Sequence, residues 1–374
     1  MERQGSVTPS RPYIGGQAVI EGVMMRAPGG VAVAVRRPDG SVVVKDGPLP
    51  SSLRAAFWKW PGLRGIGTLY ESLSLGYGAL QFSADQQEQG ATGGPGSGLS
   101  AMLPTLLLPW TLAQGPDVTD GPTAPQEPPT DGGNGGSRVA MIVSSLFALG
   151  LFIALPQLLA TLAGRLAGVE LGLSDFRFHA LTGGFKLVVL TAYLGLISRI
   201  DEIRRVFQYH GAEHKTIFAY EAGLPLDVAN VRAQSTLHPR CGTTFLIVVV
   251  IVSVLVGSVV TPLVLPGASG LGGQAATLAL RISLLPLIAA ISYELQRASA
   301  RYCTTGPLRV LLYPGFLFQK ITTREPDDAQ IEIAIASMEA AVWRNDRAEA
   351  AAEVRVFPSL EAARARTAGA PTPG

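Results

Sequence analysis

The chain has 374 residues, of which 47% are hydrophobic and only 16% are charged. Its mean hydropathy of +0.30 is too high for a soluble protein of this length, so the composition indicates a membrane protein. The net charge is +2 and the basic residues are scattered, which excludes the basic stripe of a nucleic-acid-binding protein.

The cysteines and the N-terminus narrow the class further. Cys241 and Cys303 are too few for a disulfide framework, and both fall in segments that we place on the reducing cytoplasmic side. Residues 1–12 are polar and lack an apolar core of signal-peptide length. We therefore expect insertion to rely on internal segments.

Residues 12–89 are predicted to form a cytoplasmic region with a β-hairpin and interfacial helices. Residues 31–35 and 41–45 alternate apolar and polar side chains around a Pro-Asp-Gly turn, which predicts the hairpin. Residues 53–82 have a helical pattern with Trp and Tyr near basic residues, which suits a helix at the membrane interface or one packed on a bundle. Residues 90–137 are rich in Gly, Pro, Thr and Ser, which predicts a disordered insertion.

Residues 138–298 are predicted to form a bundle of about four transmembrane helices, each near the ~20 residues needed to cross hydrocarbon. The four spans are 139–163, 179–198, 243–265 and 274–295. The second span contains Lys186, so we expect it to cross only if that side chain reaches the membrane surface.

The loop charges predict the orientation of these spans. The loops before the first span, between the second and third, and after the fourth contain most of the Lys and Arg, whereas the other two loops have no excess of either sign. Because cytoplasmic loops are enriched in Lys and Arg, we expect both termini in the cytoplasm. Residues 299–350 then form a cytoplasmic segment with an amphipathic helix at 327–343, and residues 351–374 form a tail.

Three of the four histidines lie in one predicted cytoplasmic loop, residues 199–242. His210 and His214 are four residues apart, so on a helix both project from one face and reach a single metal ion. With Glu213 they spell the His-x-x-Glu-His signature of inverted zinc peptidases, in which the glutamate is the general base.

His238 and Cys241, downstream in the chain, complete a set of four candidate ligands. If all four bind, the tetrahedral site is closed and its metal, which we expect to be zinc, is structural. If Cys241 is not a ligand, one coordination position is open for water, and Glu213 or Glu221 serves as the base. Ordinary explanations exist too: the paired histidines bond backbone carbonyls or lipid phosphates, and Cys241 is a small core residue.

Two further acids are candidates for the site. Glu294 lies at the cytoplasmic end of the fourth span, where it either contributes to catalysis or forms a salt bridge with Arg297 or Arg240. Glu21 lies in the Gly-rich stretch 15–26, which either folds over the site or is a turn-rich connector.

Several blocks of the sequence resemble the shared blocks of the uncharacterised YqhQ-like family of bacterial membrane proteins. The similarity covers residues 12–89 and 138–343, and its blocks are Gly15–Arg26, Tyr209–Lys215, His238–Thr243, Ile291–Glu294 and Thr322–Asp328. Residues 90–136 look like an insertion peculiar to this chain.

This resemblance implies a multi-span protein of the bacterial inner membrane and a metal-dependent enzyme whose site is formed by these blocks, but it implies no substrate. The last block is implied as functional by the resemblance alone, and its polar residues are Arg324, Glu325, Asp327 and Asp328.

Our leading hypothesis is a polytopic membrane protein whose cytoplasmic loop holds zinc through His210, His214 and His238. Glu213 would be the base of a hydrolytic reaction. The expected partners are the lipid bilayer and either a membrane protein or a second copy of the chain.

Two other classes of function are compatible with the sequence. In a non-enzymatic scaffold, or a factor for membrane-protein biogenesis and quality control, helices 53–82 and 327–343 would dock partners. A small transporter is the third possibility, because only Glu294, Arg281 and Lys186 break the apolar spans and four helices from one chain would need to form an oligomer.

Overall fold

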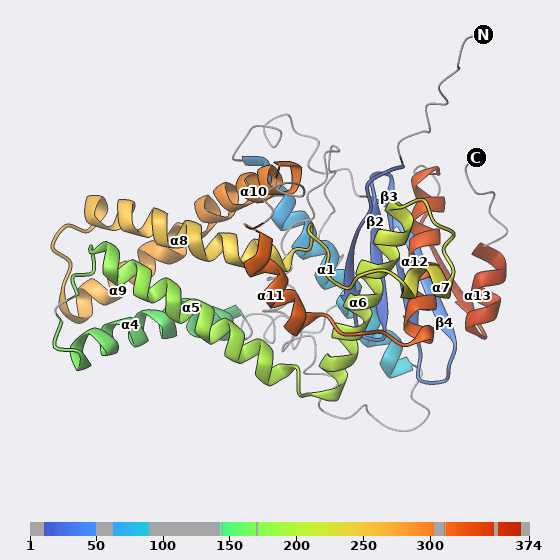
Figure 1. Cartoon of the computed structure of the whole chain (residues 1–374), viewed down its shortest axis with the longest axis horizontal. Coiled ribbons are helices and arrows are strands. Elements are labelled where there is room, and N and C mark those ends of the chain that lie inside the picture. The colour runs from blue at the N-terminus through green and yellow to red at the C-terminus, as the bar shows by residue number, and fades with distance from the viewer. Residues whose placement is uncertain are drawn as a thin grey trace, which may run out of the picture.

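A computed structural model describes residues 11–49, 63–89, 143, 145–169, 171–302, 310, 312–347 and 351–367. The molecule is elongated, with apolar helices at one end and a helix-covered sheet at the other (Figure 1). The prediction of a mainly helical chain with an N-terminal hairpin is confirmed. The predicted insertion at 90–137 and Cys303 lie outside the described residues.

An antiparallel sheet of five described strands, in the order β1-β2-β3-β4-β5, forms one layer of the structure. The strands are β1 (Gly15–Val19), β2 (Gly22–Ala27), β3 (Gly30–Arg36), β4 (Val42–Pro48) and β5 (Glu353–Phe357). The predicted hairpin is β3 and β4, in which Arg36 pairs with Val42 beside the turn.

Two expectations about the ends of this sheet are wrong. Residues 15–26 are not a turn-rich connector, because they form β1 and β2. Residues 351–374 are not simply a tail, because β5 pairs with β4 and helix α13 (Leu360–Thr367) follows it.

Different helices cover the two faces of the sheet, because successive side chains of a strand point to opposite faces. Met25 packs in the core formed with α6 (Asp201–Glu221) and α12 (Asp328–Asn345). Its neighbour Met24 packs instead with α1 (Leu63–Gln89).

Helix α12 begins where the sequence predicts. The side chain of Asp327 accepts a hydrogen bond from the backbone N–H of Gln330, and the Gln330 side chain accepts one from the N–H of Asp327. However, the helix has no free apolar face, since Ile331, Ile335 and even Arg344 are fully buried. The surface that the scaffold hypothesis needs for docking a partner on this helix is therefore covered.

Three described helices are long and apolar enough to cross a membrane: Ser145–Leu166, α5 (Phe176–Ile197) and α8 (Thr243–Val264). The first of them contains the π-helical turn η2 (Gly150–Ala154) and α4 (Leu155–Leu166). Lys186 does not reach the end of α5, because its Nζ donates to Ser253 Oγ in the middle of α8.

The predicted fourth span, 274–295, is not one straight helix. It is split into α9 (Gly270–Ser283) and α10 (Leu285–Tyr302), which are bent by 48° and count as a fourth span only when taken together. Pro286 explains the break, since its ring nitrogen cannot donate to the carbonyl four residues earlier.

Two short helices remain: α7 (Val228–Arg232) contacts α6 and α12, and α11 (Tyr313–Thr322) contacts α8 and α5 of the bundle. The loops at 167–175 and 265–269 lie at the end of the bundle away from the sheet (Figure 1). The end of α5, the start of α8 and the whole of α6 therefore lie near the junction of the two parts.

A buried cluster of ion pairs links β4 to α12 and to β5. Asp46, which is 1% exposed, has one carboxylate oxygen 3.6 Å from Arg344 Nη1 and the other 2.5 Å from Arg355 Nη2. Arg344 is itself fully buried, so the loss of this acid would leave a charge inside the protein.

Asp46→Ala should therefore lower the free energy of unfolding by about 3–5 kcal/mol, the usual cost of breaking a buried pair. Glu353→Ala is the control, because that half-exposed carboxylate lies near the same Arg355 and should matter by less than about 1 kcal/mol. Denaturant unfolding of the detergent-purified chain measures both, and equal losses would contradict the assignment.

Candidate functional site

Helix α6 places His210 and His214 one turn apart on the side that faces the bundle junction. The helix starts with Asp201 and Glu202, whose negative charges suit the positive end of the helix dipole. The two imidazole rings are 4.3 Å apart between centroids, and both residues are 2% exposed. The predicted shared face is therefore confirmed.

Backbone carbonyls orient both imidazoles. His210 Nδ1 donates to the carbonyl of Thr322 at 2.9 Å, and His214 Nδ1 donates to that of Thr236 at 2.5 Å. Because a carbonyl can only accept, each ring has its proton on Nδ1 and its lone pair on Nε2. This is the arrangement in which histidines bind metals through Nε2.

Cys241, just before α8, completes a compact group with these histidines. Its Sγ lies 3.4 Å from His210 Nε2, and one ligand atom from each of the three residues lies within 4.8 Å of the others. Burial lowers the pKa of His210 to about 4 and that of His214 well below its usual value. Both imidazoles therefore stay neutral, as a metal requires of its ligands.

His238 lies beside this compact group and is not one of its three members. Its ring centroid is 5.7 Å from that of His214, so the two separated stretches do converge. The imidazole instead approaches Glu221, with 3.6 Å between Nε2 and Oε2. Gln319 fixes the backbone here, since its amide donates to the His238 carbonyl and accepts from the His238 N–H, both at 2.8 Å.

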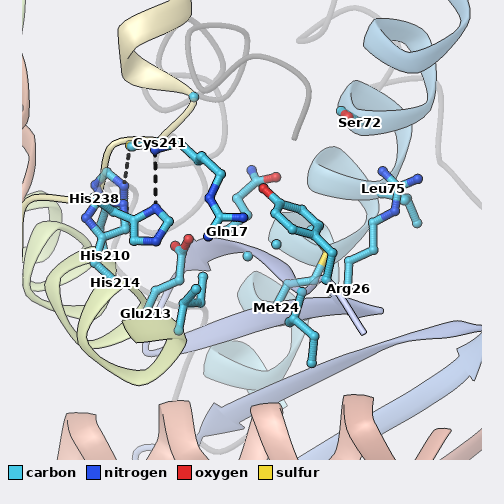
Figure 2. Close-up of a pocket in the computed structure, with 17 residues that line it drawn as sticks. Gln17, Met24, Arg26, Ser72, Leu75, His210, Glu213, His214, His238 and Cys241 are labelled. Atoms are coloured by element: carbon cyan, nitrogen blue, oxygen red, sulfur yellow. Dashed lines mark hydrogen bonds between the residues drawn. The ribbon is translucent and has the colours of Figure 1, made fainter. Parts of the chain in front are cut away.

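Glu213 faces the same pocket and is 4% exposed. Figure 2 shows its carboxylate on the side of the histidine cluster. Its side chain lies against β1, where a Cβ on Gly16 would come within 2.7 Å of Glu213 Cγ. The glycine therefore makes room for the acid.

The pocket has about 600 Å³ of empty space, part of it open to solvent, and curves around the edge strand β1. On one side lie the α6 residues and Cys241, and on the other lie residues of β2 and α1, as Figure 2 shows. The lining residues on that second side are Met24, Arg26, Ser72 and Leu75.

Glu221 and Glu294, the other predicted catalytic acids, do not line this pocket. Glu221 accepts from Arg240, the partner that we had considered for Glu294. Burial raises the pKa of Glu221, but His238 and Arg240 outweigh that effect and hold it below its usual value. Glu221 is therefore engaged in an ion pair.

The block 322–328 is a strap across α6. Arg324 donates its backbone N–H to the carbonyl of Phe207 at 2.9 Å, and Glu325 pairs with Lys215 at 3.0 Å. Asp327 caps α12, and Asp328 forms an ion pair with Arg232. The contacts of this block hold helices together, and its charged side chains do not line the pocket.

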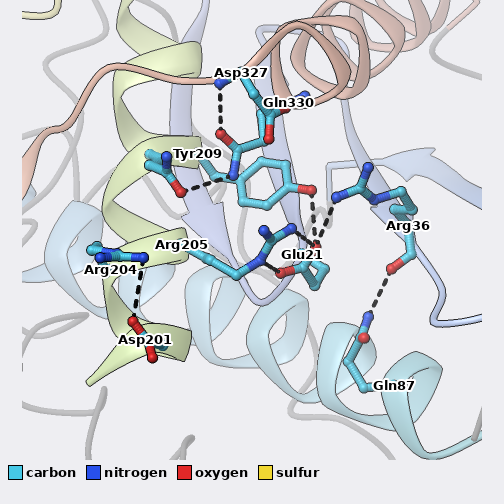
Figure 3. Close-up of polar contacts among 10 residues, drawn as sticks. Glu21, Arg36, Gln87, Asp201, Arg204, Arg205, Tyr209, Asp327 and Gln330 are labelled. Atoms are coloured by element: carbon cyan, nitrogen blue, oxygen red, sulfur yellow. Dashed lines mark hydrogen bonds and ion pairs between the residues drawn. The ribbon is translucent and has the colours of Figure 1, made fainter. Parts of the chain in front are cut away.

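Glu21 lies at the β1–β2 turn with a φ of 51°, outside the pocket. It bonds to both Nε and Nη2 of Arg205 and accepts from Tyr209 Oη at 3.2 Å, while Arg36 Nη2 lies 3.4 Å away (Figure 3). Burial raises the pKa of this carboxyl, but the two arginines outweigh burial and lower it. Glu21 thus ties the sheet to α6, one turn before His210.

Sequence reasoning missed Tyr13, Gln17 and Gln319. Tyr13 and Gln17 line the pocket, and Gln17 rests against α1 at Gly76, where a Cβ would come within 2.2 Å of its Oε1. Gln319 directly follows three apolar residues of α11, Phe316, Leu317 and Phe318, and that change in polarity was a usable signal.

Comparison with known proteins places these residues in a family. The family described as "Protein of unknown function (DUF1385)" matches residues 60–344. The chain is 32% identical over 332 residues to a Bacillus subtilis (strain 168) protein described as "Uncharacterized protein YqhQ", covering 87% of this chain and 91% of that protein. No solved structure matches the chain. The resemblance noted in the sequence is confirmed.

Gly211→Ala should disrupt the site, because a Cβ there would lie 2.0 Å from the carbonyl oxygen of Arg324. The strap would have to move, and with it the Thr322 carbonyl that orients His210. We expect a loss of about 1–3 kcal/mol, typical of overpacking. Gly184→Ala is the control, since nothing lies within 4 Å of a Cβ at that helical position. Thermal unfolding of both variants tests this, and a Gly211→Ala midpoint equal to wild type would count against the close contact.

Proposed function

The chain belongs to this family of uncharacterised proteins, and we propose that it is a membrane-bound, zinc-dependent hydrolase whose ligands are His210, His214 and Cys241. The observation that supports the proposal is the position of these three side chains. They are buried, their ligand atoms are close together, and both histidines are oriented by carbonyls.

The donor set suits zinc. Two imidazoles and one thiolate are typical ligands of this ion, whereas calcium and magnesium prefer oxygen. Three protein ligands leave a fourth position open, as in catalytic sites, where zinc acts as a Lewis acid toward water or substrate. This differs from the open site predicted from the sequence, in which His238 was the third ligand.

Glu213 is the residue that we assign as general base. It precedes His214 in the His-x-x-Glu-His pattern, is buried in the pocket and has its carboxylate near the cluster (Figure 2). Its role would be to accept a proton from the attacking water and to return it to the leaving group. Gly16 gives this side chain room, and burial protects it from bulk solvent.

The apolar helices support a membrane setting. Leu166, Leu196 and Leu263 are 80%, 70% and 76% exposed, and such large apolar side chains need an apolar environment when they cover whole helices. With the basic loops facing the cytoplasm, the pocket would lie at the inner surface of the bacterial inner membrane. The substrate would then be a peptide or ester bond presented close to the bilayer.

Metal analysis tests the proposal on the purified full-length chain. We expect about one zinc per chain, lost in His210→Ala, His214→Ala and Cys241→Ser. His179→Ala is the matched control, because this histidine lies on α5 outside the pocket and should leave zinc unchanged. His238→Ala should also keep zinc. If the wild-type chain binds no zinc, the ligand assignment is wrong.

Glu213→Gln separates a catalytic from a structural metal. Loss of a general base should reduce hydrolysis of a peptide library by about 10²–10⁴-fold, while the zinc content stays at the wild-type level. Gln319→Leu should instead weaken zinc binding or activity by about 10–100-fold, as expected for a residue that positions the site. Zinc binding with unchanged hydrolysis in Glu213→Gln would mean that Glu213 is not the base.

A further inference from the structure

Two basic side chains lie inside the helical bundle, roughly halfway along its helices and away from the zinc ligands. Lys186 is near the middle of α5, and Arg281 is near the end of α9. They line a second pocket together with Ile153, Ser253, Gly257 and Leu285. The proposed hydrolytic reaction uses neither residue.

Arg281 is only 8% exposed, and its guanidinium contacts two side chains of α5. Its Nη2 lies 3.1 Å from His179 Nδ1 and its guanidinium lies 5.5 Å from the centroid of the Phe178 ring. Because arginine can only donate, His179 accepts at Nδ1 and is neutral. Arg281 Nη1 is buried and makes no hydrogen bond among the described residues.

Gly257 and Ser253 of α8 shape the other wall. A Cβ at Gly257 would come within 2.9 Å of His179 Nδ1, so the glycine allows this ring to approach Arg281. Ser253 Oγ accepts from Lys186 Nζ at 3.0 Å. Lysine has three donors, so this single bond leaves capacity for a ligand.

No carboxylate of the described residues pairs with either cation, and none lines the pocket. Elsewhere in the described residues, buried arginines have acidic partners. Arg26 pairs with Glu71 at 2.8 Å, and Arg344 pairs with Asp46. A buried cation without a counter-ion is costly, and more so inside a bilayer, where it marks a functional site by default.

The helix break lies at the same pocket. Leu284 and Leu285, at the junction of α9 and α10, line the pocket, so the N-terminal end of α10 lies beside the two cations. The C-terminal end of α9 lies at the same break, so the dipoles of the two helix ends offset each other, and the positive charge of the pocket comes from Lys186 and Arg281.

We propose that this pocket binds a phosphate group. Arginine offers a planar pair of donors that matches phosphate oxygens, and lysine adds a mobile point charge. A phosphate monoester has a charge of about −1.5 to −2 at neutral pH, which balances the two cations. The group is either inorganic phosphate or the head group of a lipid that enters between the helices.

Titration of the full-length chain in neutral detergent tests the proposal. One arm uses sodium phosphate at constant ionic strength, and the other uses dihexanoyl phosphatidic acid as a soluble lipid phosphate. Binding is followed by calorimetry and by the thermal unfolding midpoint. A saturable response to the first probe indicates free phosphate as the ligand, and a response only to the second indicates a lipid head group.

Lys186→Met and Arg281→Met should each weaken binding at least about tenfold, because each removes one of two charges in a buried site. Arg165→Met is the matched control, since it removes one charge from an exposed position of α4 and should bind as wild type does. Lys186→Arg keeps the charge and should retain binding, which decides the matter if the neutral variants fail to fold. No saturation by either probe, or wild-type affinity in a folded Lys186→Met variant, would overturn the proposal.

Discussion

The close approach of α6 to the strap at 322–328 is the constraint on which the rest of the site depends. Gly211 has no side chain, so the carbonyl of Arg324 can lie directly against the helix. That approach brings the Thr322 carbonyl to His210, while the loop with Thr236, which also lies beside Gly211, brings its carbonyl to His214. Two flexible imidazoles thus become rigid groups with a defined tautomer.

Buried cations have different partners in the sheet region and in the bundle. In the sheet region, the buried cations Arg26 and Arg344 each have an acidic partner, which offsets the cost of removing them from water. In the bundle, Lys186 and Arg281 have only neutral side-chain partners among the described residues. The first arrangement stabilises a fold, whereas the second leaves positive potential available to a ligand.

Local patterns in the sequence were sufficient for much of the fold. Alternation with a Pro-Asp-Gly turn identified β3 and β4, Asp327 marked the start of α12, and uninterrupted apolar stretches identified the helix Ser145–Leu166 and α8. The His-x-x-Glu-His spacing likewise put two imidazoles and Glu213 on one helix. Each of these signals depends on residues within a few turns of each other.

The features that the sequence did not reveal depend on contacts between distant parts of the chain. β5 is short and its Val354 and Val356 are exposed, so only its pairing with β4 identifies it as a strand. The position of the His238 backbone depends on Gln319, about eighty residues away, which bonds to its N–H and its carbonyl. The burial of α12 likewise depends on the N-terminal sheet, and helical spacing alone does not reveal it.

The packing of the first strands against α12 also determines when the fold can be completed during synthesis. Ser337 on α12 donates to the carbonyl of Ala32 on β3, a contact between residues 305 positions apart. Contacts at such a separation form only after the intervening chain has emerged from the ribosome. One face of the nascent sheet therefore stays uncovered by α12 until every apolar helix of the bundle has been translated.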